Sequence, residues 1–215
     1  MYQAPRRAKR LYFDVIPRAI DDYLGFVEKM PNEDPAKAVD NPAWHIHNGK
    51  SVEHHAAGVS FAMLLNLASV AHTDDKDVLW QYLRRYVPGA TPENAPYLDR
   101  LLQGAVAYYQ DFVKSTKKFR LPAGKERAAL SDLADTLRRI PESESAEFIQ
   151  NEVYEAGKRH FAKEELRQWF KTLYEVLLGS EQGPRMGAFI KLYGRDNVVR
   201  LIERALAGED LSKAA

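Results

Sequence analysis

A loop-to-helix junction near the end of the chain, residues 183–187, has a composition that could bind a phosphate. It consists of Gly-Pro-Arg-Met-Gly. The two glycines permit close approach of another backbone, and Pro184 can begin a short helix whose first N–H groups are free to bind an anion. Arg185 would add positive charge and a planar donor group. The alternative is a structural Gly-Pro turn with a solvated arginine.

Aromatic and basic residues continue along the same short helix. Phe189 and Tyr193 lie four residues apart, with Lys191 between them. Aromatic side chains can stack on unpaired nucleic-acid bases, and an exposed lysine can meet a phosphate. The alternative for both rings is that they pack in the core.

A further set of candidates lies upstream. Trp169 falls on the apolar stripe of an expected helix, where core packing competes with base stacking, and Arg167 projects from the opposite side. Lys158 and Arg159 begin a basic cluster that could equally be a solvated helix face. The candidate nucleic-acid contacts are therefore Arg185, Phe189, Lys191, Tyr193, Arg167, Trp169, Lys158 and Arg159. Two further basic zones comprise Lys114, Lys117, Lys118, Arg120 and Lys125, and Arg6, Arg7, Lys9 and Arg10.

The sequence offers no arrangement typical of a catalytic or metal site. Cysteine is absent, which excludes thiol catalysis and disulfides and fits a cytoplasmic protein. His45, His47, His54 and His55 could suggest zinc, but adjacent histidines point to different faces of a helix and further ligands are missing. We expect no catalytic residues, no metal and no bound cofactor in this chain.

Composition favours a globular protein that is neither a membrane protein nor a DNA-coating one. The 215 residues are 45% hydrophobic, and 31 basic residues against 30 acidic ones leave a net charge of +1. Local basic patches can still bind RNA at this balance. The most apolar run, residues 56–71, is too short to span a bilayer and is expected to be a buried helix.

Apolar residues recur every three or four positions along most of the chain, which predicts an all-α fold. One such stripe is Leu166, Trp169, Phe170, Leu173, Tyr174 and Leu177. The strongest interruption, Pro88-Gly89 followed by Pro92 and Pro96, suggests a boundary between residues 1–92 and 93–215. We also expect a long loop over residues 31–51. Residues 6–23 read as helix almost from the first residue, which suggests a fragment of a longer protein.

Three segments resemble class I lysyl-tRNA synthetases, and together they sample nearly the whole chain. They are MYQAPRRAKRLYFDVIPRAIDDY (residues 1–23), NPAWHIHNG (residues 41–49) and YEVLLGSEQGPRMGAFIKLYG (residues 174–194). The resemblance implies an ATP-dependent ligase that esterifies lysine onto its tRNA. Its Rossmann catalytic domain, which binds ATP, has no counterpart here. Residues 45–49 echo that domain's HIGH-type signature, but they follow no strand and are interpreted as a decoy.

The resemblance also implies the role of this portion. Residues 1–92 would be a helical stem-contact region after the catalytic domain, and residues 93–215 a helical bundle that binds the anticodon. The expected partners are the anticodon loop and stem of lysine tRNA and the catalytic domain of the same enzyme. The isolated chain would not catalyse aminoacylation. The competing hypothesis is a stand-alone helical interaction or scaffold domain with no RNA role.

Overall fold

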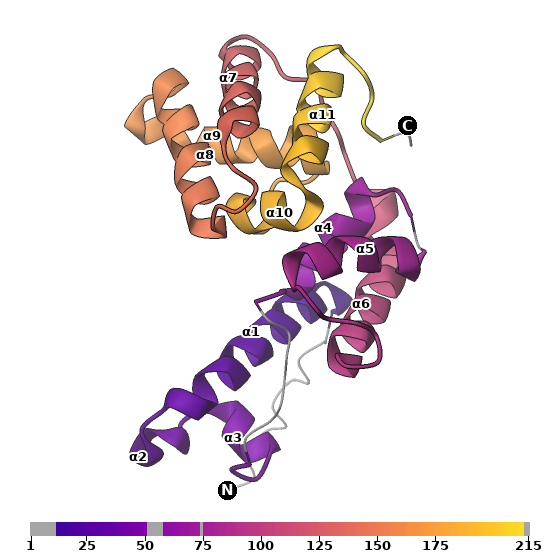
Figure 1. Ribbon diagram of the computed structural model, residues 1–215, viewed down its shortest axis with the longest axis vertical. Helices are drawn as coiled ribbons and strands as arrows, with labels where there is room; N and C mark the ends of the chain where they lie inside the picture. Colours follow the sequence, from indigo (N-terminus) through magenta and orange to yellow (C-terminus); the bar gives the residue numbers. More distant parts are fainter. Residues whose placement is uncertain (1–11, 51–57, 74, 213–215) are drawn as a thin grey trace, which may run out of the picture. The chain divides into compact units, whose positions relative to one another are not determined.

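The computed structural model describes residues 12–50, 58–73 and 75–212. Every regular element within these ranges is a helix, which confirms the predicted all-α class. Packing divides the chain into two compact units, Met1–His54 and His55–Ala215, which are described separately (Figure 1). This division does not fall at residue 92. It concerns packing alone, so the assignment of separate functions to residues 1–92 and 93–215 stays a prediction.

The first unit is built on α1 (Ile16–Lys29), an amphipathic helix that begins with a proline in its first turn and buries Leu24 and Val27. Proline is tolerated there because the first N–H groups of a helix have no intrahelical acceptor. Short 3₁₀ turns, η1 (Phe13–Val15) and η2 (Met30–Asn32), flank α1. The helix contacts α3 (Pro42–Ile46) within the same unit.

The long loop expected over residues 31–51 contains two short helices, so that prediction was wrong. They are α2 (Pro35–Ala38) and α3. Asp34 and Asn41 cap them, accepting hydrogen bonds at 2.9 Å from the backbone N–H groups of Ala36 and Ala43. Pro35 and Pro42 lie within that expected loop, where each follows a capping residue and begins a helix.

The second unit begins with α4 (Phe61–Val70), the buried helix predicted within residues 56–71. Ser60 caps it by accepting a hydrogen bond from the Met63 N–H at 3.1 Å. Helix α6 (Pro96–Tyr108) packs against α4, and α5 (Lys76–Tyr86) contacts α6. Asp99 joins these two helices by accepting from the Trp80 Nε1 at 2.8 Å. No described helix combines the length and apolar character needed to cross a membrane.

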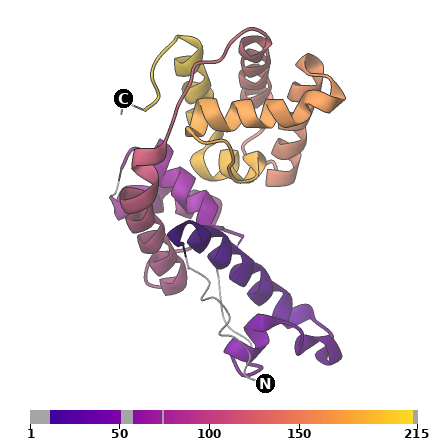
Figure 2. The same ribbon diagram turned by 180° about the vertical axis from the view of Figure 1, so that it is seen from behind.

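The remaining helices form a bundle in the same unit. The elements are η3 (Tyr109–Val113), η4 (Lys114–Thr116), α7 (Lys125–Arg139), α8 (Ala146–His160), η5 (Lys163–Glu165), α9 (Leu166–Leu173), η6 (Tyr174–Leu178), α10 (Met186–Tyr193) and α11 (Arg195–Leu206). Helix α8 contacts both α7 and α10, and α11 contacts α7. Figure 2 shows α9 and the π turn that continues it crossing the back of this bundle.

Candidate nucleic-acid interface

The junction at residues 183–187 is packed tightly against neighbouring helices. A Cβ atom on Gly187 would lie 2.1 Å from the carbonyl oxygen of Ala146, so α10 meets the start of α8 at backbone contact. The Gly187 N–H donates to the Gln150 Oε1 at 2.9 Å. One of the amides expected to bind a phosphate is therefore already occupied by a side chain. Arg185 is exposed, and its predicted phosphate contact stays a prediction.

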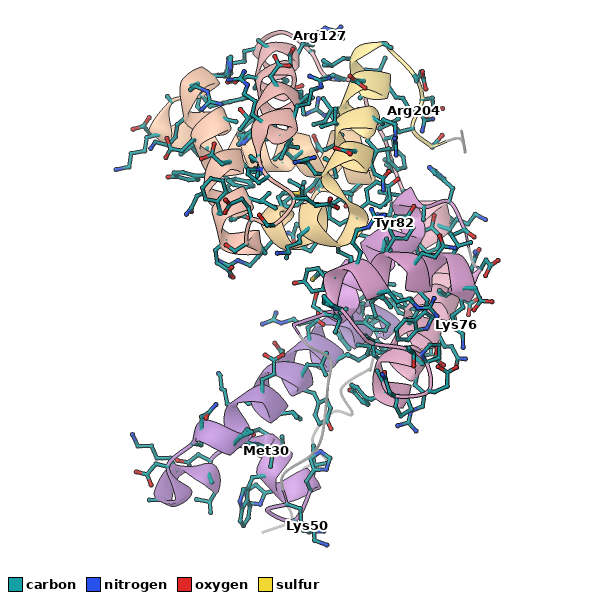
Figure 3. All side chains as sticks on the ribbon, in the orientation of Figure 1. Met30, Lys50, Lys76, Tyr82, Arg127 and Arg204 are labelled. Atoms are coloured by element: carbon teal, nitrogen blue, oxygen red, sulfur yellow. The ribbon has the colours of Figure 1, made fainter. Side chains whose placement is uncertain are left out.

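Phe189 and Tyr193 follow the core-packing alternative. Phe189 is fully buried and Tyr193 is 8% exposed, so neither ring presents an open face to a base. Their rings stack with centroids 5.8 Å apart, and Tyr193 stacks in turn on Tyr82 of α5 at 5.3 Å. Burial raises the pKa of Tyr193 to about 12. The three-ring stack ends at Tyr82, which is partly exposed on the side of α5 that meets α10 (Figure 3).

Trp169 is also a core residue rather than a stacking surface. Its side chain is fully buried, and its Nε1 donates to the Val153 carbonyl at 3.0 Å. Arg167 lies exposed on the same helix, beside the open groove that Phe170 and Lys171 line. Of the two residues on α9 that we selected, only Arg167 is therefore placed where an RNA could reach it.

The selected residues of α8 take part in ion pairs. Lys158 lies 2.8 Å from the Glu155 Oε1. Arg159 donates to both carboxylate oxygens of Asp132, at 2.6 and 3.0 Å, and His160 lies 2.9 Å from the same group. Arg159 is the main reason why the pKa of Asp132 falls below its ordinary value. Both cations are exposed but partly neutralised by neighbouring carboxylates.

Several cations of the basic zone at residues 114–125 make contacts within the chain. The Lys117 Nζ donates to the Leu178 carbonyl at 2.7 Å, and Arg120 pairs with Glu126 and Glu175 at 2.7 Å each. Arg6, Arg7, Lys9 and Arg10 lie outside the described residues, as do His54 and His55. His45 and His47 are hydrogen-bonded to Val39 and Tyr23, and no cluster of potential metal ligands occurs among the residues that the structure describes.

A cavity of about 370 Å³ opens beside Tyr82, between α5 and the start of α11. Arg85, Arg195 and Arg200 line it together with Glu142. Gly194, at φ +97°, precedes α11 in a backbone conformation that other residues rarely adopt. A Cβ atom there would lie 3.0 Å from the Arg85 Nη1, so the Arg85 guanidinium rests directly against this glycine.

A second cavity of about 300 Å³ adjoins the first and has an apolar floor. Arg85, Glu142, Gly194 and Arg195 line both cavities, which together we call the α5–α11 groove. Cavities that bind small ligands measure roughly 300–1,000 Å³, so each half could accommodate a single small group. The floor of the second cavity comprises Leu137, Ile140, Pro141, Ile149 and Ile190.

Lys191 is the one selected residue that lines the groove. It is partly buried, and its Nζ donates to the backbone carbonyl of Glu144 at 2.8 Å. Its ammonium is thus held beside the segment that joins α7 and α8. A phosphate at this end of the groove would meet a positioned lysine, although we had expected a fully exposed one.

The charges in the groove differ in how far they are neutralised. Arg195 donates to the Ile140 carbonyl and lies 3.2 Å from Asp196, and Arg200 donates to the Asn197 side chain. Arg85 and Glu142 have no ion-pair or hydrogen-bond partner in the described part of the chain, although they line the same cavities. The start of α11 adds a partial positive charge, because no side chain caps its first N–H groups. The groove can therefore attract an anionic ligand with polar edges.

Sequence reasoning missed Tyr82, Arg85, Glu142 and Arg200. Tyr82 and Arg85 lie three residues apart and so share one face of α5. This spacing was the only local pattern that could have indicated them as a pair. Glu142 and Arg200 come from the α7–α8 connection and from α11, and nothing in their spacing predicts that they meet Arg85. The sequence shows a glycine, Gly194, before an expected helix, but it does not predict that this glycine contacts Arg85.

Comparison with known proteins identifies relatives over nearly the whole chain. Lysine–tRNA ligase of Rickettsia bellii (strain OSU 85-389) is 47% identical over 207 residues, which are 96% of this chain and 40% of the relative. Lysine–tRNA ligase of Roseobacter denitrificans (strain ATCC 33942 / OCh 114) is 48% identical over 212 residues, 99% of this chain and 40% of the relative. That of Rickettsia felis (strain ATCC VR-1525 / URRWXCal2) is 45% identical over 207 residues.

The chain spans about two fifths of the length of the curated relatives that it matches. It is therefore homologous to a part of lysyl-tRNA synthetases. No family model matches the chain.

Proposed function

We propose that this chain is the tRNA-binding part of a class I lysyl-tRNA synthetase, an enzyme that attaches lysine to its tRNA with ATP. The observation that carries the proposal is identity of 45–48% to lysine–tRNA ligases over at least 96% of the chain. Lysine activation and ATP binding would belong to the remaining three fifths of the enzyme, which would act in the cytoplasm. Residues 1–92 would contact the tRNA stem, and residues 93–215 the anticodon.

The α5–α11 groove supports this proposal physically. Sequence-specific recognition of RNA acts mainly on unpaired loop bases, which are held by stacking and by hydrogen bonds to their edges. The groove provides a cluster of arginines for phosphates, a partly exposed tyrosine and an apolar floor. Arg185 and Arg167 are exposed and would extend the contact along the phosphate backbone.

The competing function is a helical scaffold with no RNA role. It is favoured by the burial of Trp169 and Phe189 and by the ion pairs of Lys158 and Arg159, which leave fewer free RNA-binding groups than the sequence suggested. The two hypotheses differ in RNA affinity, because a tRNA-binding domain releases counterions on binding and a scaffold does not.

The test is binding of the purified chain to lysine tRNA, and to the same tRNA with an altered anticodon, across a salt series. We expect the affinity to fall steeply with salt and to favour the native anticodon. Arg85→Ala and Arg200→Ala should each weaken binding and reduce the salt slope by about 1, as loss of a phosphate contact does.

Arg84→Ala is the matched control, because Arg84 is an exposed neighbour on α5 that does not line the groove. Equal losses for Arg84→Ala and Arg85→Ala would show that the groove is not the binding site. No binding at low salt by the folded chain would refute the proposed function and favour the scaffold.

A further inference from the structure

An exposed aromatic ring, Phe148, lies in the first turn of α8, outside the α5–α11 groove. Within the part of the second unit that the structure describes, the exposed aromatic side chains are Phe112, Phe148 and Tyr154. Phe112 packs against Tyr108 and Tyr154 against Phe170, with ring centroids 5.1 and 6.5 Å apart. Phe148 is 40% exposed and contacts no other ring among the described residues. Packing within the chain therefore does not account for this ring.

The backbone that carries Phe148 is held in place on two sides. Ser145 caps α8 by accepting a hydrogen bond from the Phe148 N–H at 3.1 Å. A Cβ atom on Gly187 would lie 2.1 Å from the Ala146 carbonyl oxygen, so α10 packs directly against this turn. Only the two side-chain torsions of Phe148 remain to be ordered by a ligand, which keeps the entropic cost of binding low. The ring is therefore a preorganised surface for a flat group.

The cavity beside Phe148 adjoins the α5–α11 groove. It has a volume of about 410 Å³, and Ile140 and Pro141 line it together with Phe148. Ile140 and Pro141 also line the second cavity of the groove, so the two spaces meet at the connection between α7 and α8. An extended RNA strand that lies in the groove can therefore continue to Phe148 along the protein surface.

The charged groups of this cavity balance one another. The guanidinium groups of Arg139 and Arg159 and the carboxylates of Asp132 and Glu152 line it, and Arg159 is already paired with Asp132 at 2.6 Å. The adjoining cavity of the groove is lined by three cations and one carboxylate. Phosphates are therefore attracted to the groove, whereas the cavity beside Phe148 suits the uncharged part of a nucleotide, its base.

We propose that Phe148 is a stacking platform for one unpaired base of an RNA whose phosphates lie in the α5–α11 groove. An aromatic face stacks on any of the four bases, so the contact adds affinity without selecting a base. Bases within a duplex are stacked on their neighbours and do not reach the ring, whereas loop bases can turn out to meet it. The assignment rests on the proposed function for its ligand class, RNA, and adds the residue that distinguishes unpaired from paired RNA.

The experiment measures binding of the full chain to lysine tRNA and to a fully paired RNA duplex across a salt series. Loss of one stacked base corresponds to about tenfold in affinity, so Phe148→Leu should bind the tRNA about tenfold more weakly. The slope of log affinity against log salt should not change, because no phosphate contact is lost. Phe148→Trp, which keeps an aromatic face, should retain the affinity of the wild type. Neither substitution should alter binding of the duplex.

Tyr154→Leu is the matched control. Tyr154 is an exposed ring on the same helix that does not line the cavity, so its variant should bind the tRNA as the wild type does. Unchanged tRNA affinity in Phe148→Leu, or equal losses for tRNA and duplex, would overturn the stacking contact. If the wild type binds lysine tRNA with salt dependence in that case, the proposed function stands and only the assignment of Phe148 fails.

Discussion

The ion-pair network around Glu126 allows a quantitative prediction about stability. Glu126 accepts from the Arg120 guanidinium at 2.7 and 2.8 Å, from the buried Thr172 hydroxyl at 2.8 Å and from the Ala123 N–H at 3.0 Å. These contacts connect the segment before α7 to α9, and Arg120 also reaches Glu175 at 2.7 Å. The hydrogen bonds from Arg120 are the main reason why the pKa of Glu126 falls to about 2.

The magnitude follows from the difference between the folded and unfolded pKa values. A lowering from 4.5 to about 2 corresponds to about 3 kcal/mol at 1.4 kcal/mol for each pKa step of one. Solvent reaches Arg120, whose side chain is 34% exposed, and screens part of this interaction. We therefore expect Glu126→Gln to lower the free energy of unfolding at pH 7 by about 2 kcal/mol.

The pH dependence has a definite sign. Because the folded pKa is depressed, the native state binds fewer protons than the unfolded state between pH 2 and 4.5. The stabilisation is fully present above pH 4.5 and is lost as the pH falls towards 2. Roughly half or less of the difference between wild type and Glu126→Gln should remain at pH 3.

Urea unfolding followed by the fluorescence of the buried Trp80 and Trp169 measures this difference. Glu164→Gln, which removes an exposed carboxylate on the surface, is the control and should change little at any pH. A Glu126→Gln effect of the same size at pH 7 and pH 3 would refute the argument, because it would show that the carboxylate charge is not what stabilises the contact.

Three further changes test other parts of the structure. Trp169→Phe should lower the free energy of unfolding by about 1–3 kcal/mol, through a small cavity and the lost bond to the Val153 carbonyl, and leave tRNA affinity unchanged. A loss of affinity in folded protein would instead place this ring at the interface. Lys117→Met removes a buried ammonium group. Burial lowers the pKa of this group from 10.5 to about 8. As the pH rises, the Lys117 ammonium loses its proton at a lower pH in the native state than in the unfolded state, so the wild type should gain stability relative to this variant between pH 8 and 10.5. Urea midpoints of the two proteins measure this gain. A difference in midpoint that does not change with pH would contradict the burial of this charge. Gly187→Ala should destabilise the chain by about 1–3 kcal/mol in thermal unfolding, because its Cβ would lie 2.1 Å from a backbone oxygen. Gly25→Ala is the control, because a Cβ atom at this position inside α1 would have no atom within 4 Å, and it should be neutral or stabilising. Similar effects of Gly187→Ala and Gly25→Ala would refute the close contact at Gly187.

Periodicity predicted the helices well because burial of one face follows directly from spacing. Leu166, Trp169, Leu173 and Leu177, which belong to one predicted stripe, are all buried. Phe170 and Tyr174, on the edge of that stripe, are only partly buried and line an open groove. A stripe therefore predicts the centre of a buried face, whereas its edges depend on how far the neighbouring helices extend.

Helix ends were harder to predict, because proline acts in two opposite ways. It interrupts a helix in the interior and favours one at the first position. Pro35 and Pro42 are of the second kind, and the signal that distinguishes them is the capping Asp34 or Asn41 immediately before. The segment 45–49 was expected in a loop, but it begins inside α3 because Pro42 starts that helix instead of preventing it.

In the candidate site, the aromatic and basic residues of α10 lie next to the groove, but most of them do not line it. Phe189 and Tyr193 were selected because such rings stack on bases, and they do stack, but on each other and on Tyr82. Their burial holds Tyr82 at the surface, three residues before Arg85 on the same helix. The aromatic residues of α10 thus pack behind the groove. The groups that could touch a nucleotide come from α5, from α11 and from the connection before α8. Residues that support a site must pack densely, and dense packing leaves a strong local pattern in the sequence. Exposed charged residues such as Glu142 and Arg200 leave almost none, so the contacts could be found only once the fold had brought them together.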